Sequence, residues 1–447
     1  MHTIIVHVKA FFKGICTKNE KSPLGVPKTD CLTSQTSSLR RDGTTDKEME
    51  TLFYQDAFNN TEENAALVRE LVSFATDFGL EGNVWQQWLT YKLITDENPF
   101  SLACERRAVR KDSTLRKLAM PDLTEARRMM HSEAPPMMTE YCPPYADSEM
   151  TPAGRRLRAL SLSLAEAQSD EAFCDCLTAA YEKYGCGDFS LFRAFRASDI
   201  MEAGGSRNPY IVPVSEASDV TFDDLIGYEK QKETLRANTE AFVNGQHANN
   251  VLLYGDSGTG KSTSVHALMH EYYDRGLRLI EISKQQRHLM PQIMSGIKRR
   301  NYRFILFLDD LSFEENESDY KELKAMLEGA LEKREDRVLI YATSNRRHLI
   351  RETWGDRQDM EYNEDIHRSD TMEEKLSLAA RFGVTIYYPK PLPREYMDIV
   401  RSLAGKKGLE IDSAELEDTA RKWELRHGGM SGRTASQLIT WLEGQQK

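Results

Sequence analysis

The sequence lacks the features of secreted and membrane-spanning proteins. None of its apolar runs approaches the roughly 20 residues that a helix across a bilayer needs. Its seven cysteines form no C-x-x-C pair and are odd in number, which argues against a disulfide framework. Cys174 and Cys176 are close in sequence, but no second pair of ligands at zinc spacing accompanies them. We therefore expect reduced, packing cysteines in a cytoplasmic protein without a membrane partner.

Basic residues are fewer than acidic residues. The 447-residue chain carries 59 Lys and Arg against 70 Asp and Glu, a formal net charge of −11. This balance argues against indiscriminate coating of nucleic acid, although short basic clusters leave room for a local basic surface. Hydrophobic residues make up 40% of the chain, which is enough for sizeable cores, and the length predicts more than one domain.

The N-terminal half divides into a leader and a helical region. From residue 1 to residue 41 the chain has few acids, many Ser and Thr, and little hydrophobic periodicity. We therefore expect residues 1–50 to be a disordered leader. Because Met49 directly precedes the first helical pattern, translation that starts there rather than at Met1 is an open alternative. Over 51–200, apolar residues recur at helical spacing, which predicts an all-helical N-terminal domain.

Residues 255–262 have the G-x-x-x-x-G-K-[ST] pattern of a phosphate-binding loop. An apolar run at 251–254 predicts a buried strand before the loop, and a helical pattern follows it. The glycines let backbone N–H groups converge on phosphate oxygens, Lys261 can reach the β- and γ-phosphates, and Ser262 can hold Mg²⁺. The predicted ATP-binding residues of this loop are Gly255, Asp256, Ser257, Gly258, Thr259, Gly260, Lys261 and Ser262.

Beyond a glycine-containing linker at 201–218, predicted strands alternate with helices. The expected strands are 251–254, 278–282, 304–308, 338–343 and 385–388. Such alternation predicts an α/β domain with a parallel, doubly wound sheet. We place this domain at 219–392 and a helical domain at 393–447.

Polar residues follow two of these strands. Asp309 and Asp310 come directly after the strand at 304–308. Since ligands of open α/β sheets bind beyond the carboxyl ends of strands, this pair should lie beside the phosphate loop. Asp309 is the predicted Mg²⁺ ligand together with Ser262, and Asp310 would orient or deprotonate the attacking water. Asn345 ends another strand and could bond the γ-phosphate or the water, although Ser-Asn is also ordinary turn chemistry.

Residues 219–447 resemble an AAA+ ATPase module, with 255–262 as Walker A and 304–310 as Walker B. The resemblance implies a five-stranded parallel P-loop sheet with a helical lid. It also implies a role for each matching residue. Ile226 and Gly227 lie in the segment that resembles the adenine pocket, Asn345 matches sensor 1, Arg381 resembles the arginine finger, and Arg433 resembles the sensor-2 arginine. A closer match, carried by 309–313 and 343–348, is to a bacterial AAA+ family catalogued as a domain of unknown function.

Two positions depart from the common AAA+ pattern. Asp310 stands where most such enzymes have Glu. Replication initiators also carry Asp at this position, which points toward the initiator and helicase-loader branch, whose members act as slow switches. Glu314 or Glu315 could supply the base instead. Two alanines precede Arg381, where an acidic residue is more usual. This leaves Arg346, Arg347 and Arg357 as alternative fingers.

The resemblance also implies a function and its partners. We expect Mg²⁺-dependent ATP hydrolysis in a homo-oligomeric ring or open ring that remodels or loads an unidentified protein or nucleic-acid client. One alternative is a slow ATP-dependent binding switch of the helicase-loader type. A nucleotide-kinase-like phosphotransferase is a weaker hypothesis, because the sequence shows no evident acceptor-binding lid.

Overall fold

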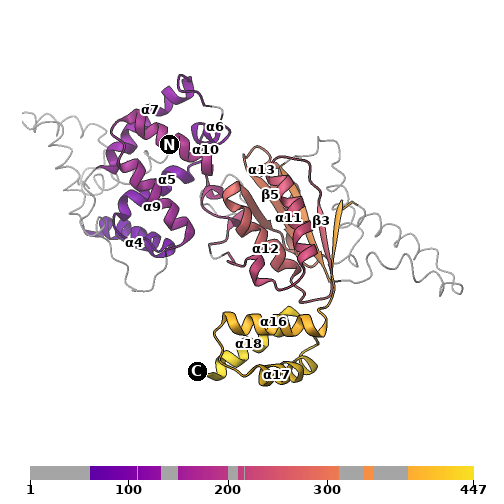
Figure 1. Ribbon diagram of the computed structural model, residues 1–447. Helices are drawn as coiled ribbons and strands as arrows, with labels where there is room; N and C mark the ends of the chain where they lie inside the picture. Colours follow the sequence, from indigo (N-terminus) through magenta and orange to yellow (C-terminus); the bar gives the residue numbers. More distant parts are fainter. Residues whose placement is uncertain are drawn as a thin grey trace, which may run out of the picture. The chain divides into compact units, whose positions relative to one another are not determined.

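A computed structural model describes most of the chain. The described residues are 61–107, 109–131, 150–199, 210–215, 217–311, 337–345 and 381–446. Contacts divide the chain into two units, Met1–Leu191 and Phe192–Lys447, and each is described by itself (Figure 1). Several predictions fall outside the described residues: the leader, the bases Glu314 and Glu315, and the alternative fingers Arg346, Arg347 and Arg357.

The described part of the first unit is helical, as the periodicity predicts. Its helices are α4 (Thr61–Phe78), α5 (Val84–Thr95), α6 (Pro99–Glu105), α7 (Thr114–Met130), α9 (Pro152–Ala165) and α10 (Asp170–Tyr184), with a 3₁₀ turn η2 (Asp188–Ser190). Short polar side chains set the helix starts. Asn98 caps α6, Ser113 caps α7 and Ser169 caps α10, each accepting a backbone N–H of the first turn.

Aromatic side chains build the core of this unit. The rings of Phe74, Phe78 and Tyr91 contact one another with centroids 5.1 to 5.7 Å apart. The fully buried Tyr181 donates its hydroxyl to the carbonyl of Leu93, 2.7 Å away. These residues therefore hold the helices together, which is the packing role that their spacing predicts.

The second unit is built on one sheet. Its core strands are β3 (Val251–Gly255), β4 (Leu277–Glu281), β5 (Arg303–Leu308), β6 (Val338–Ser344) and β7 (Val384–Tyr388). They confirm the five predicted strands to within a residue at either end. The sheet order is β2-β1-β4-β5-β6-β3-β7, and all neighbours are parallel except β1 and β2. This places β6 between β3 and β5.

Two short strands extend the predicted sheet at one edge. β1 (Ala194–Ala197) pairs in parallel with β4, and β2 (Ile211–Pro213) pairs with β1 in the antiparallel sense. Both lie within 51–218, where we expected only helix and linker. Strands of four and three residues are too short for an alternating pattern to be read in the sequence. The division of contacts accordingly falls after Leu191, and the sheet begins before the linker.

Helices pack against this sheet. They are α11 (Glu229–Val243), α12 (Lys261–Tyr272) and α13 (Met290–Ile297). The 3₁₀ turn η3 (Phe222–Asp224) precedes α11, η4 (Tyr273–Arg275) follows α12, and η5 (Lys284–Leu289) leads into α13. α12 contacts β4 and β6, and α11 contacts β7. Buried apolar side chains of the central strands form the core, among them Val251, Leu253 and Phe307. Strands with such continuous apolar runs are typical of a sheet covered on both faces.

Three helices after the sheet form the lid. They are α16 (Pro393–Lys406), α17 (Ser413–Arg426) and α18 (Gly432–Gln446). They share a core of their own, in which Tyr396, Ala420 and Leu438 are fully buried. Ile226 from the segment before α11 packs against this core. The architecture confirms the AAA+ fold class: a parallel P-loop sheet, a helical lid and a helical region that precedes both.

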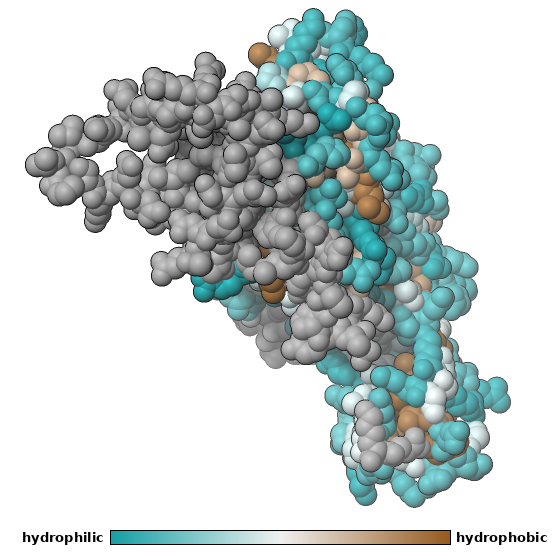
Figure 2. Space-filling view, turned by 90° about the vertical axis from the view of Figure 1, so that its left-hand side faces the viewer, coloured by the Kyte–Doolittle hydropathy of each residue, from teal (hydrophilic) through white to brown (hydrophobic). Residues whose placement is uncertain are grey.

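Outside the grey atoms, the surface that Figure 2 shows is mainly hydrophilic. Figure 2 shows one face, on which hydrophobic residues outside the grey atoms occur in small scattered groups. Large apolar side chains that are exposed include Leu118, Leu425 and Trp441. Within the described parts of the chain, no helix is both long enough and apolar enough to cross a membrane.

Asn250 offers a test of the sheet. Its buried side chain accepts the backbone N–H of Ile340 at 2.9 Å, and its carbonyl accepts the N–H of Val384 at 3.2 Å. In Asn250→Ala the Ile340 N–H loses its partner, so we expect the free energy of unfolding to fall by about 1 to 3 kcal/mol. Urea denaturation measures this; a loss no larger than that of the exposed Asn244→Ala would contradict the assignment.

Candidate functional site

The phosphate loop has the backbone that its glycines were expected to allow. Gly255, Gly258 and Gly260 all have positive φ, at 137°, 75° and 91°. At Gly255 a Cβ would lie 2.1 Å from the carbonyl oxygen of Tyr388, so a side chain does not fit there. α12 begins at Lys261, and its N-cap Gly260 provides no side-chain cap. The first N–H groups of α12 therefore point out of the helix with no side chain bonded to them, as in anion sites.

Lys261 is buried at the base of this loop. Its Nζ donates to the carbonyl oxygens of Gly255 (3.2 Å) and Asp256 (2.7 Å) and to Oδ1 of Asn345 (3.0 Å). Burial lowers the pKa of Lys261 to about 8, while carboxylates such as Asp256 and Asp309 act in the opposite direction. The ammonium is thus buried, and several carboxylates lie close to it.

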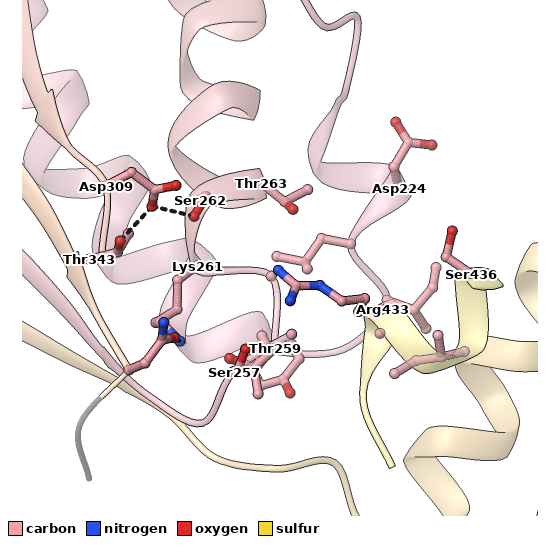
Figure 3. A pocket seen from close by; sticks show the side chains of 18 of the residues that line it. Asp224, Ser257, Thr259, Lys261, Ser262, Thr263, Asp309, Thr343, Arg433 and Ser436 are labelled. Carbon is pink, nitrogen blue, oxygen red and sulfur yellow. Dashed lines mark hydrogen bonds between the residues drawn. The ribbon is translucent and has the colours of Figure 1, made fainter. Parts of the chain in front are cut away.

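Asp309 is anchored by two hydroxyls. Ser262 Oγ and Thr343 Oγ1 each donate to the same oxygen, Oδ1, at 2.6 Å (Figure 3). No described residue donates to the other oxygen, Oδ2. A carboxylate held in this way keeps one oxygen free and still has the neighbouring Ser262 hydroxyl oxygen beside it. Hydroxyl and carboxylate oxygens are the ligands that Mg²⁺ prefers.

Asp310 has an unusual backbone and a defined partner. Its φ of 51° lies in the left-handed region, which few residues other than glycine, Asn and Asp adopt. The carboxylate Oδ1 accepts a hydrogen bond from Asn345 Nδ2 at 2.7 Å. Because Asn345 also accepts from Lys261, this amide links the loop lysine to the second carboxylate.

The lid closes the site from the opposite side. The N–H of Arg433 donates to the carbonyl of Gly258 at 3.3 Å. A Cβ at Gly258 would lie 3.1 Å from Cβ of Arg433, so the loop and α18 approach within van der Waals contact. On the other flank, Lys406 of α16 forms an ion pair with Asp224 at 2.7 Å. The lid therefore contacts both the phosphate loop and the turn that precedes α11.

These elements enclose a cavity of about 550 Å³. Its lining combines polar and apolar side chains. Loop residues and carboxylates line it together with Leu225, Ile226, Ile399 and Leu403, of which the last three also pack in or against the lid core. Figure 3 shows the Lys261, Ser262 and Asp309 side chains at one part of this cavity and Arg433 and Ser436 at another. A lining with both kinds of side chain suits a ligand with a charged chain and a planar ring.

The residues present fit a nucleotide with Mg²⁺. The loop offers uncapped N–H groups and glycines without room for a Cβ, which suits phosphate oxygens. Ser262 and Asp309 would hold the cation, and Lys261 would pair with the phosphates. The apolar part of the lining would receive the base.

Comparison with known proteins places the chain in a family. A family model described as a protein of unknown function (DUF815) matches residues 196–446. The chain belongs to the DUF815 family. The match covers nearly all of the second unit, from within β1 to the end of α18. The motifs and strand order above identify this DUF815 chain as an AAA+ P-loop protein.

More distant similarities are local. Replication factor C large subunits of Methanococcus maripaludis (strain C5) and Methanococcus vannielii are 32% and 31% identical to this chain over 74 residues. That is 17% of this chain, which spans about 15% of the length of these curated relatives. Among solved structures, the RuvB Holliday junction branch migration motor of Thermotoga maritima has a TM-score of 0.36 and 19% identity over 49% of this chain and 63% of that one. The FIGL-1 AAA domain in complex with ADP has a TM-score of 0.35 and 20% identity, over 50% and 72%.

The structure of the DUF815 chain brings most of the predicted site residues together. Those that line the cavity are Ile226, Ser257, Gly258, Thr259, Gly260, Lys261, Ser262, Asp309, Asp310, Asn345 and Arg433. Gly255, Asp256 and Gly227 do not line it. They shape it instead, since Gly255 and Asp256 supply the carbonyls that hold Lys261, and Gly227 (φ 79°) turns the chain before α11. Arg381 lies outside the cavity, just before β7, and its role as a finger stays a prediction.

Sequence reasoning missed part of the lining. Thr343 and Tyr228 were not assigned, nor were the lid residues Ile399 and Leu403. Tyr228 has φ of 62°, and its hydroxyl donates to the carbonyl of Pro389 at 2.9 Å. No motif marks these positions. For Thr343 a signal was available, because it directly follows the apolar run 338–342 of a buried strand and stands two positions before Asn345.

The ion pair of Asp224 and Lys406 should be visible in pH dependence. The hydrogen bond from Lys406 is the main reason why the pKa of Asp224 is lowered to about 2. A lowered carboxyl pKa adds stability above the unfolded-state pKa near 3.9, and that stability is lost as pH falls from about 4 to about 2. Lys406→Met should therefore cost at most about 1 kcal/mol at pH 7, since the pair is exposed. The difference from wild type should shrink on acidification or in 1 M salt, as followed by urea denaturation. A difference that stays constant from pH 6 to pH 2.5 would argue against the pair.

Proposed function

We propose that this protein binds ATP with Mg²⁺ and hydrolyses it in a homo-oligomer to remodel or load a macromolecular partner. The observation that carries the proposal is the convergence of the phosphate loop, two carboxylates and Asn345 on one cavity that the lid also lines. Each group comes from a different strand end, and together they are the parts that phosphoryl transfer to water requires.

Each side chain has a role that follows from its contacts. Lys261 exchanges its carbonyl and amide partners for phosphate oxygens. Asp310 accepts a proton from the attacking water or orients it, and Asn345 positions Asp310 through their hydrogen bond. The bound cation supplies charge neutralisation of the phosphates, and Ser262 and Asp309 would hold it.

Arg433 couples the nucleotide to the lid in this proposal. Its backbone bonds the phosphate loop, and its side chain belongs to the cavity lining. A triphosphate in the loop would attract the guanidinium and draw α18 toward it. In the oligomer, Arg381 would approach the site of a neighbouring subunit and stabilise charge in the transition state.

A slow binding switch is the second candidate. Two features of Asp310 favour it. Its carboxylate accepts a hydrogen bond from Asn345, and its side chain is one methylene shorter than the usual Glu. In this second candidate, the hydrogen bond and the shorter side chain would hold the carboxylate back from a γ-phosphate. In that case ATP and a non-hydrolysable analogue should support capture of the partner equally well. Capture with ATP alone would favour the remodelling ATPase.

Lys261→Ala should weaken ATP binding at least about 10-fold, because a buried charge pair with the phosphates is lost. Asp310→Asn should leave ATP binding close to wild type but lower turnover by about 100-fold or more. Isothermal titration calorimetry and a phosphate-release assay measure the two effects. The exposed Lys230→Ala serves as the matched control. Unchanged affinity in Lys261→Ala would refute both candidate functions.

Turnover per subunit should rise with protein concentration, because the finger comes from a neighbour. Arg381→Ala should lower turnover by about 10³-fold or more, the usual value of such an arginine, and remove the concentration dependence. Arg426→Ala, another exposed arginine, should change neither. Flat turnover across a dilution series together with an active Arg381→Ala would exclude a finger at this position.

A further inference from the structure

Thr343 occupies a position that none of the nucleotide motifs includes. It is the penultimate residue of β6, and its side chain is almost fully buried, with 2% exposed. β6 lies between β3, which leads into the phosphate loop, and β5, which leads into Asp309 and Asp310. Thr343 therefore stands where both halves of the site meet.

The hydroxyl of Thr343 bonds both carboxylate residues in different ways. It donates its one hydrogen to Oδ1 of Asp309 at 2.6 Å, and it accepts the backbone N–H of Asp310 at 2.9 Å. A hydroxyl has one donor hydrogen and two acceptor lone pairs, so a single group satisfies both contacts. The carbonyl of Thr343 in addition accepts the N–H of Leu311 at 2.6 Å.

These bonds fix the orientation of the Asp309 carboxylate, the predicted cation ligand, and the backbone of Asp310, the residue predicted to orient water. The bond to Asp309 holds the carboxylate by Oδ1, the same oxygen that Ser262 contacts. The bond to the N–H of Asp310 supports its left-handed backbone, which an L-residue adopts only at some cost. The direction of the Asp310 side chain depends on that backbone conformation.

We propose that Thr343 is a positioning residue that sets Asp309 for Mg²⁺ and Asp310 for water through one hydroxyl. This inference rests on the proposed nucleotide site but adds a residue and a role to it. It identifies β6 as the element that keeps the two carboxylates in register with the phosphate loop. It also requires a hydroxyl at 343, rather than a side chain of a given size.

Thr343→Val and Thr343→Ser separate these requirements. Valine has nearly the shape of threonine but no hydroxyl, whereas serine keeps the hydroxyl. The readout is the affinity for a non-hydrolysable ATP analogue, measured by calorimetry in EDTA and in Mg²⁺. The ratio of the Kd in EDTA to the Kd in Mg²⁺ is the Mg²⁺ gain. It reports how strongly the cation supports nucleotide binding, independently of turnover.

In Thr343→Val we expect the Kd in EDTA to be unchanged and the gain from Mg²⁺ to fall about 10- to 100-fold, the factor for a lost bond to a charged group. Thr343→Ser should keep the wild-type gain. Thr239→Val is the matched control, because Thr239 is also fully buried and its hydroxyl bonds Tyr341, away from the cavity. It should lose stability but keep the Mg²⁺ gain.

The inference is overturned if folded Thr343→Val keeps the wild-type gain, or if Thr343→Ser loses it as valine does. Thr343→Ala repeats the test if the valine variant does not fold. The outcome is distinct from that of the proposed function. Wild-type protein that binds the analogue with a Mg²⁺ gain but never releases phosphate refutes hydrolysis alone, and the variants still decide the role of Thr343.

Discussion

The insertion of β6 between β3 and β5 is the constraint on which the site depends. Parallel pairing aligns Tyr254 with Ser344 on one side and Leu308 with Ala342 on the other. Three carboxyl ends therefore meet at one edge, and each carries a different functional group. If β6 were elsewhere in the sheet, Thr343 and Asn345 would no longer lie between the phosphate loop and the two carboxylates, and they could not bond to both.

The bonds across this edge form one connected network. Lys261 bonds Asn345, Asn345 bonds Asp310, and Thr343 joins Asp310 to Asp309. Every link contains a charged or buried group, and such bonds are costly to leave unmade. A nucleotide that draws Lys261 away from Asn345 would therefore change the hydrogen bonding of Asp310. In this way β6 would couple nucleotide binding to the position of the Asp310 carboxylate.

Much of this arrangement could be predicted from local sequence. The loop at 255–262 needs glycine for its positive φ values, and the apolar runs before it and before Asp309 are long enough to mark buried strands. Motifs of this kind encode local chemistry, so they can be read without the fold. The strands at 194–197 and 211–213 could not be predicted, because they are short and acquire their hydrogen bonds only from β4 and from each other.

The sequence by itself determined which groups are available: a phosphate loop, a buried lysine, two consecutive aspartates, an asparagine at a strand end and an arginine at the start of the last helix. Only the tertiary structure decided their partners. Strand order gave Thr343 its two bonds, and packing of the lid brought Ile399 and Leu403 to the cavity. The reason is physical: strand pairing and helix docking join residues separated by tens to hundreds of positions, and no local pattern records which of them will meet.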